Sequence, residues 1–115
     1  MPTSNRESIR NDRRYVGLYN DLYGGMTPIG NIIRDAWVFG ILPEDQTCDG
    51  WEIGQIQALQ SQVNAKWDEY GLRPSALPDD LRERHERIHN EAIARAREHG
   101  WVPGRDIDSD MDDNG

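Results

Sequence analysis

The residues with the clearest chemical potential are two histidines and a glutamate in the run His85-Glu86-Arg87-Ile88-His89. This run matches the pattern H-E-x-x-H, which places two histidines one turn apart on the same face of a helix. Two imidazoles in this arrangement can share a zinc ion, and the glutamate can act as a general base. The motif therefore raises a metal-dependent hydrolase as one hypothesis for the function.

The motif resembles that of the zincin metalloproteases, but the resemblance covers these five residues only. Zincin motif helices are mostly uncharged around the ligands, and the extended metzincin form adds a glycine and a third histidine. This chain departs from both patterns at Arg84, Arg87, Ala92 and Arg95. His99 and Glu91 are candidates for a third ligand, and neither stands at a known spacing.

We therefore expect no metal and no cofactor at His85 and His89. In this interpretation His85 packs between Leu81 and Ile88 at the edge of the core, and His89 is half exposed. The metal-dependent hydrolase that uses His85, Glu86 and His89 is kept as the alternative function.

Cys48 is the only cysteine, so no disulfide can form within the chain. The neighbouring Asp45 and Asp49 are expected to raise the pKa of its thiol and make it a poor nucleophile. No other arrangement of residues predicts a catalytic nucleophile.

Three tyrosines spaced four residues apart predict an aromatic stripe along the first expected helix. They are Tyr15, Tyr19 and Tyr23, and they lie close to a cluster of arginines at Arg10, Arg13 and Arg14. Tyrosine and arginine are enriched at binding hot spots, so this helix is the predicted site of contact with a protein partner. The alternative is that the tyrosines belong to the rim of the core.

Helical spacing of apolar residues predicts four helices, over about 5–23, 28–39, 50–70 and 79–99. The segment 28–39 is apolar nearly all round, so we expect it to be buried at the centre, with the other helices around it. Thr27 is its expected N-cap and Pro28 its first residue. Arg34 and Asp35 are its only charges and are expected to mark a narrow side that faces solvent.

The same sequence motif, x-Gly-apolar-x-Pro, stands at the C-terminal end of three of the four expected helices. The three copies are Phe39-Gly40-Ile41-Leu42-Pro43, Tyr70-Gly71-Leu72-Arg73-Pro74 and His99-Gly100-Trp101-Val102-Pro103. Each predicts a helix that ends on a left-handed glycine, with proline preventing continuation. The helices between the copies do not resemble one another, so this is not a structural repeat.

The formal net charge of −8 over 115 residues argues against direct binding to nucleic acid or to an anionic membrane. We expect neither a secretory signal nor a membrane span, and therefore a cytoplasmic protein. Residues 105–115 are acidic and poor in apolar side chains, so we expect a disordered tail after a single helical domain over 1–104.

The predicted fold is all-α, a small bundle or orthogonal array of about four helices. The predicted function is a non-enzymatic accessory or regulatory protein that acts through a protein partner, which includes the case of a homodimer. A second alternative is an acidic inhibitor that mimics nucleic acid and occupies a basic site on another protein.

Overall fold

The computed structural model describes residues 14–102, and this part of the chain is all-α. Its three α-helices are α2 (Pro28–Val38), α3 (Ile53–Asp68) and α4 (Asp79–Glu98). Three single 3₁₀ turns accompany them: η1 (Leu18–Asn20), η2 (Leu22–Gly24) and η3 (Pro74–Ala76). Residues 14–102 contain no β-strand, only an isolated antiparallel bridge between Arg14 and Glu52. None of the helices in this range combines the length and the apolar character needed to cross a bilayer.

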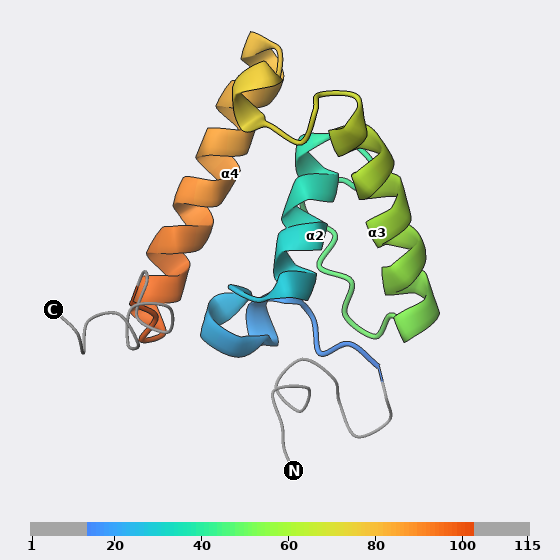
Figure 1. Cartoon of the computed structure of the whole chain (residues 1–115). Coiled ribbons are helices and arrows are strands. Elements are labelled where there is room, and N and C mark those ends of the chain that lie inside the picture. The colour runs from blue at the N-terminus through green and yellow to red at the C-terminus, as the bar shows by residue number, and fades with distance from the viewer. Residues whose placement is uncertain (1–13, 103–115) are drawn as a thin grey trace, which may run out of the picture.

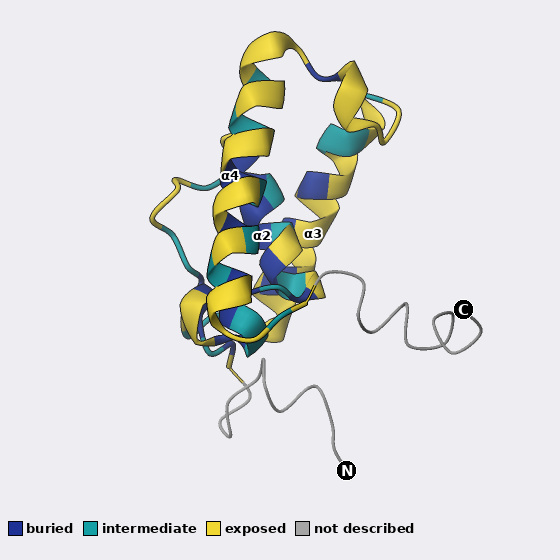
Figure 2. Ribbon diagram, turned by 90° about the vertical axis from the view of Figure 1, so that its left-hand side faces the viewer, coloured by how far each residue is buried: buried dark blue, intermediate teal, exposed yellow. Residues whose placement is uncertain are grey.

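Helix α2 occupies the centre, between α3 and α4 (Figure 1), and packs against both. Its buried side chains include Ile33, Ala36, Trp37 and Val38, which confirms the expected central helix. The outer faces of α3 and α4 are exposed along much of their length (Figure 2). The core therefore consists of apolar side chains between α2 and α3 and between α2 and α4. Its buried members are Tyr15, Leu18, Ile33, Ala36, Trp37, Val38, Cys48, Ile56, Leu59, Val63 and Ile88.

The beginning of α2 matches the sequence pattern. Thr27 is the N-cap, and its Oγ1 accepts a hydrogen bond from the Gly30 N–H at 3.0 Å, while Pro28 occupies the first helical position. Helix α3 begins three residues later than expected, because Cys48 and Gly50 both adopt positive φ and turn the chain. Its capping box is formed by Glu52 and Gln55.

The three helix stops are confirmed as Schellman motifs. Gly40, Gly71 and Gly100 each have positive φ, at 74°, 64° and 93°. In each copy the N–H of the residue after the glycine donates to the carbonyl five positions earlier, for example Ile41 to Ala36 at 2.9 Å. These bonds satisfy carbonyls that the end of a helix leaves without intrahelical partners.

The expected first helix over 5–23 is wrong for the part that the structure describes. Residues 14–17 form no helix, and Tyr15 exchanges hydrogen bonds with the loop before α3 through Trp51 O and Gly50 N. Gly17 has φ 99° and Tyr23 has φ 54°, so no α-helix can pass through either residue. Backbone hydrogen bonds between Tyr15 and the loop before α3 replace the intrahelical hydrogen bonds that the spacing of the apolar residues predicted.

The predicted four-helix array is accordingly not what residues 14–102 form, since the described part has three α-helices. The segment 5–13 of the expected first helix and the expected disordered tail over 105–115 lie outside the described residues.

Candidate metal site

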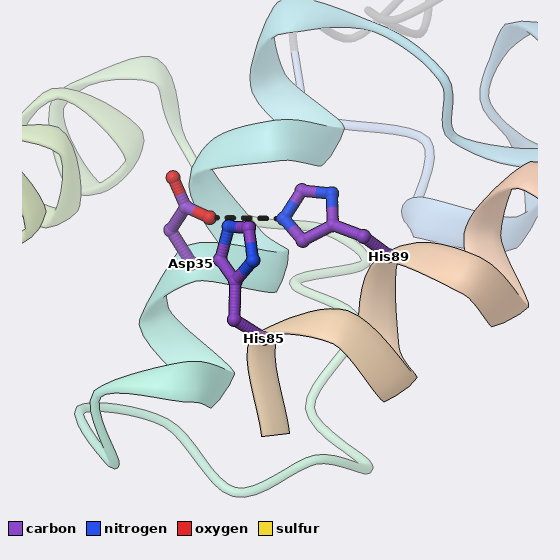
Figure 3. A group of neighbouring side chains, drawn as sticks. All are labelled: Asp35, His85 and His89. Carbon is purple, nitrogen blue, oxygen red and sulfur yellow. Dashed lines mark hydrogen bonds and ion pairs between the residues drawn. The ribbon is translucent and has the colours of Figure 1, made fainter. Parts of the chain in front are cut away.

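Three side chains with metal-binding chemistry meet between α2 and α4 (Figure 3). Asp35 comes from α2, and His85 and His89 come from successive turns of α4. One ligand atom from each residue lies within 4.8 Å of the other two. The imidazole rings of the two histidines are 4.2 Å apart between centroids, with their planes tilted by 34°.

The contact between Asp35 and His89 has the separation that two ligands of one ion adopt. His89 Nε2 lies 3.3 Å from Asp35 Oδ1, which is long for a charge-assisted hydrogen bond. Two ligand atoms bound to a tetrahedral zinc ion at about 2.0–2.1 Å stand about 3.3 Å apart.

Two arginines of α4 tie this helix to the end of α2 and to the loop that follows it. Arg84 donates to the carbonyl of Val38 at 2.9 Å, near the C-terminal end of α2. Arg87 donates to both carboxylate oxygens of Glu44, at 3.1 and 2.9 Å, in the loop that follows α2. Charged residues beside the histidines are untypical of zincin motif helices. In the structure both guanidinium groups bind elsewhere.

The cluster is also supported from α3, by Trp67. The indole Nε1–H donates to Asp35 Oδ2 at 3.0 Å, and the indole ring meets the His85 ring edge-on at 5.8 Å between centroids. Phe39 packs against Trp67 in the same edge-on manner, at 5.1 Å, and Tyr70 stacks on Phe39. An aromatic row therefore fills the space between α3 and α4 and ends at the two histidines.

The electrostatic environment keeps His85 available as a ligand. Burial lowers the pKa of His85, and the neighbouring His89 acts in the same direction. The carboxylates of Asp35 and Glu86 oppose this shift. A histidine binds a metal only in its neutral form, so a lowered pKa favours coordination. The Asp35 and His89 side chains remain 19% and 28% exposed, so both are partly accessible to solvent.

The placement of the motif residues agrees in part with the sequence analysis. His89 is half-buried, as expected. His85, which was expected to pack between Leu81 and Ile88, is also half-buried and meets the rings of Trp67 and His89. The third ligand candidate is Asp35, in a different helix, rather than His99 or Glu91, both of which are exposed. Glu86 is exposed and is not one of the three clustered groups.

The expectation that Arg34 and Asp35 mark a side of α2 facing solvent is wrong. Arg34 is only 1% exposed, and its guanidinium donates to the Gly25 carbonyl at 2.8 Å and to the side chains of Asn31 and Met26. Burial lowers its pKa. Helix α2 is covered on more sides than α3 and α4. Its two charged residues, Arg34 and Asp35, therefore both hydrogen-bond to other parts of the protein. The presence of a charged residue at position 35 in a mostly apolar helix is the sequence signal that could have pointed to Asp35, because buried charges need partners.

The expected tyrosine stripe does not form, because residues 14–24 are not an α-helix. Tyr15 is fully buried, and its hydroxyl donates to Asp21 at 2.8 Å. Burial is the main cause that raises the Tyr15 pKa far above its ordinary value. Tyr19 is 46% exposed, and the Arg95 guanidinium lies 4.4 Å from its ring centroid. Tyr23 is half-buried.

Of the expected arginine cluster, only Arg14 lies in the described residues. It donates to the Gly50 carbonyl at 3.1 Å and forms an ion pair with Glu52 at 3.4 Å. Arg10 and Arg13 lie outside the described range. Of the residues predicted to form the interaction face, Arg14 and Tyr19 are exposed within residues 14–102, and the Tyr19 ring lies against Arg95.

Cys48 is buried and is not one of the three clustered groups. Burial raises the pKa of its thiol to about 12. The cause of this raised pKa is burial and not the expected effect of Asp45 and Asp49, because this loop packs its cysteine into the core.

No protein-family model matches this chain, and no curated protein or solved structure shows significant similarity to it. The chemistry of the site is therefore argued from its geometry alone.

Proposed function

We propose that this protein binds a divalent transition metal ion through Asp35, His85 and His89. The bound ion fastens α4 to α2, and the protein is a non-enzymatic accessory protein. The single observation that carries this proposal is the convergence of the three ligand atoms within 4.8 Å across two helices. Imidazole and carboxylate ligands suit Zn²⁺ and its neighbours Co²⁺ and Ni²⁺.

A structural role is better supported than hydrolysis. A hydrolase needs a general base within reach of the metal-bound water, and Glu86 lies exposed outside the cluster. A structural ion, in contrast, needs only ligands from elements that must stay together. Here His89 and Asp35 are separated by 54 positions along the chain, so an ion bound to both would close a long loop.

Titration of protein without a purification tag is expected to show one Zn²⁺ or Co²⁺ per chain. At an ion concentration 100 times the Kd, the free energy of unfolding should rise by about 2.7 kcal/mol, because the ion binds only the folded chain. Affinity should fall as the pH is lowered, since a metal ion binds only deprotonated ligands. Calorimetry and urea denaturation with and without the ion measure these effects.

The variants His85→Ala and Asp35→Asn should each remove this stabilisation. His99→Ala is the matched control, because His99 is an exposed histidine at the end of the same helix and outside the cluster. Binding that is lost equally in His99→Ala, or that persists in His85→Ala, would assign the ion to another place and contradict the proposal.

We further propose that the accessory role is exercised through a protein partner, a second copy of the chain included. The observation that favours a partner is the exposed ring of Tyr19 with the half-buried Arg95 guanidinium over it, since tyrosine and arginine are enriched at binding hot spots. The pair lies where η1 meets the C-terminal half of α4, so a partner bound there would contact both segments.

Tyr19→Ala is expected to weaken this association by about 30-fold, which corresponds to the roughly 2 kcal/mol of a hot-spot residue. Sedimentation of the purified chain measures self-association, and quantitative capture from the source cell measures a different partner. Leu72→Ala is the control, since Leu72 is 66% exposed and belongs to the loop after α3. Equal association of wild type and Tyr19→Ala would remove this surface from the proposal.

A further inference from the structure

Trp67 contacts two of the three candidate ligands although it lies on the helix that supplies none of them. Its Nε1–H donates to Asp35 Oδ2 at 3.0 Å, while the other oxygen, Oδ1, faces His89 Nε2 at 3.3 Å. The two carboxylate oxygens therefore have separate partners. Only Oδ1 is directed toward the position that an ion shared with the histidines would occupy.

The orientation of the indole is itself held by packing. Phe39 meets the Trp67 ring edge-on at 5.1 Å, and the Phe39 ring is stacked in parallel with Tyr70 at 6.1 Å. On the other side, the Trp67 ring meets His85 edge-on at 5.8 Å. A ring fixed on both sides keeps its N–H directed at the same carboxylate oxygen.

We infer that Trp67 is a positioning residue that makes Asp35 a monodentate ligand and so selects a small, four-coordinate ion. This inference rests on the proposed metal-binding function. A carboxylate with one oxygen engaged by an N–H offers the ion a single oxygen. Zn²⁺ and Co²⁺ accept such a set with water in the fourth position, whereas Ca²⁺ takes six to eight oxygen ligands, often from bidentate carboxylates. Partners of this kind in the outer shell commonly tune metal affinity.

Trp67→Phe tests the inference, because it removes the N–H and keeps an aromatic ring in the row. The probe is Co²⁺, whose visible absorption is strong in four-coordinate sites and weak at higher coordination numbers. In the variant we expect the absorption to weaken as Asp35 becomes bidentate, and the affinity for Co²⁺ to fall about 10–100-fold. Trp101→Phe is the matched control, since Trp101 lies beyond the end of α4.

A purely structural role for Trp67 would change stability without changing the cobalt spectrum. Unfolding of the metal-free variants by urea therefore accompanies each titration. If Trp67→Phe does not fold, benzothienylalanine at position 67 keeps the shape of the indole and lacks the N–H.

The outcomes separate this inference from the proposed function. Failure of the wild-type chain to bind Co²⁺ overturns the metal site and the inference together. Binding by the wild-type chain, with an unchanged spectrum and affinity in the folded variant that lacks the N–H, overturns the role of Trp67 alone. A weakened absorption band and affinity, with unchanged values in Trp101→Phe, support it.

Discussion

Replacing Trp37 by alanine is expected to lower the free energy of unfolding by about 3–5 kcal/mol, the range found for removal of a buried large aromatic side chain. Trp37 lies in the middle of the core on α2 and is 7% exposed. Its Nε1–H also donates to the Gln46 carbonyl at 3.0 Å, which ties the loop after α2 to that helix. The substitution would leave both a cavity and an unpaired carbonyl.

Urea denaturation followed by circular dichroism measures this loss. Because a small domain has about 5–15 kcal/mol of stability in total, the variant should be substantially less resistant to urea. Leu72→Ala is the control at the surface, with an expected change within about 0.5 kcal/mol. A Trp37→Ala variant as stable as the wild type would mean that α2 is not the centre of the core.

Replacing Gly30 by alanine is expected to destabilise the protein by about 3 kcal/mol or more, although alanine is the better helix former. A Cβ at position 30 would lie 1.9 Å from the carbonyl oxygen of Gly25 and 3.2 Å from Leu18 Cδ1. The first of these neighbours is backbone, in the turn after η2, and cannot rotate away. Relief would require the first turn of α2 to move from this turn and to break the bond between Arg34 and the Gly25 carbonyl.

Gly54→Ala is the matched control, because Gly54 lies in the first turn of α3 and a Cβ there meets nothing within 4 Å. This substitution should stabilise the protein by about 0.5–1 kcal/mol through helix propensity alone. Opposite signs for the two glycines, measured by thermal or urea unfolding, would confirm the close approach at Gly30. A stabilising Gly30→Ala would contradict it.

The α-helical character and the helix boundaries could be predicted because they depend on neighbours in the sequence. The cap at Thr27 and the glycines at 40, 71 and 100 act within one turn, and three helices were placed to within three residues at each end. The conformation of residues 14–24 could not be predicted in this way. The spacing of Tyr15, Tyr19 and Tyr23 is helical, but backbone bonds to the loop before α3 decide how this segment folds.

The candidate metal site also has one part that the sequence predicts and another part that only the tertiary structure shows. The sequence alone determined that His85 and His89 share one face of a helix, because that follows from 3.6 residues per turn. It also determined that the segment around Trp37 is the most apolar of the chain. Only the tertiary structure decided that Asp35 faces the two histidines, that Trp67 holds its second oxygen, and that Arg84 and Arg87 point elsewhere. These contacts join helices far apart in sequence, and they depend on how α3 and α4 pack around α2, which no local spacing encodes.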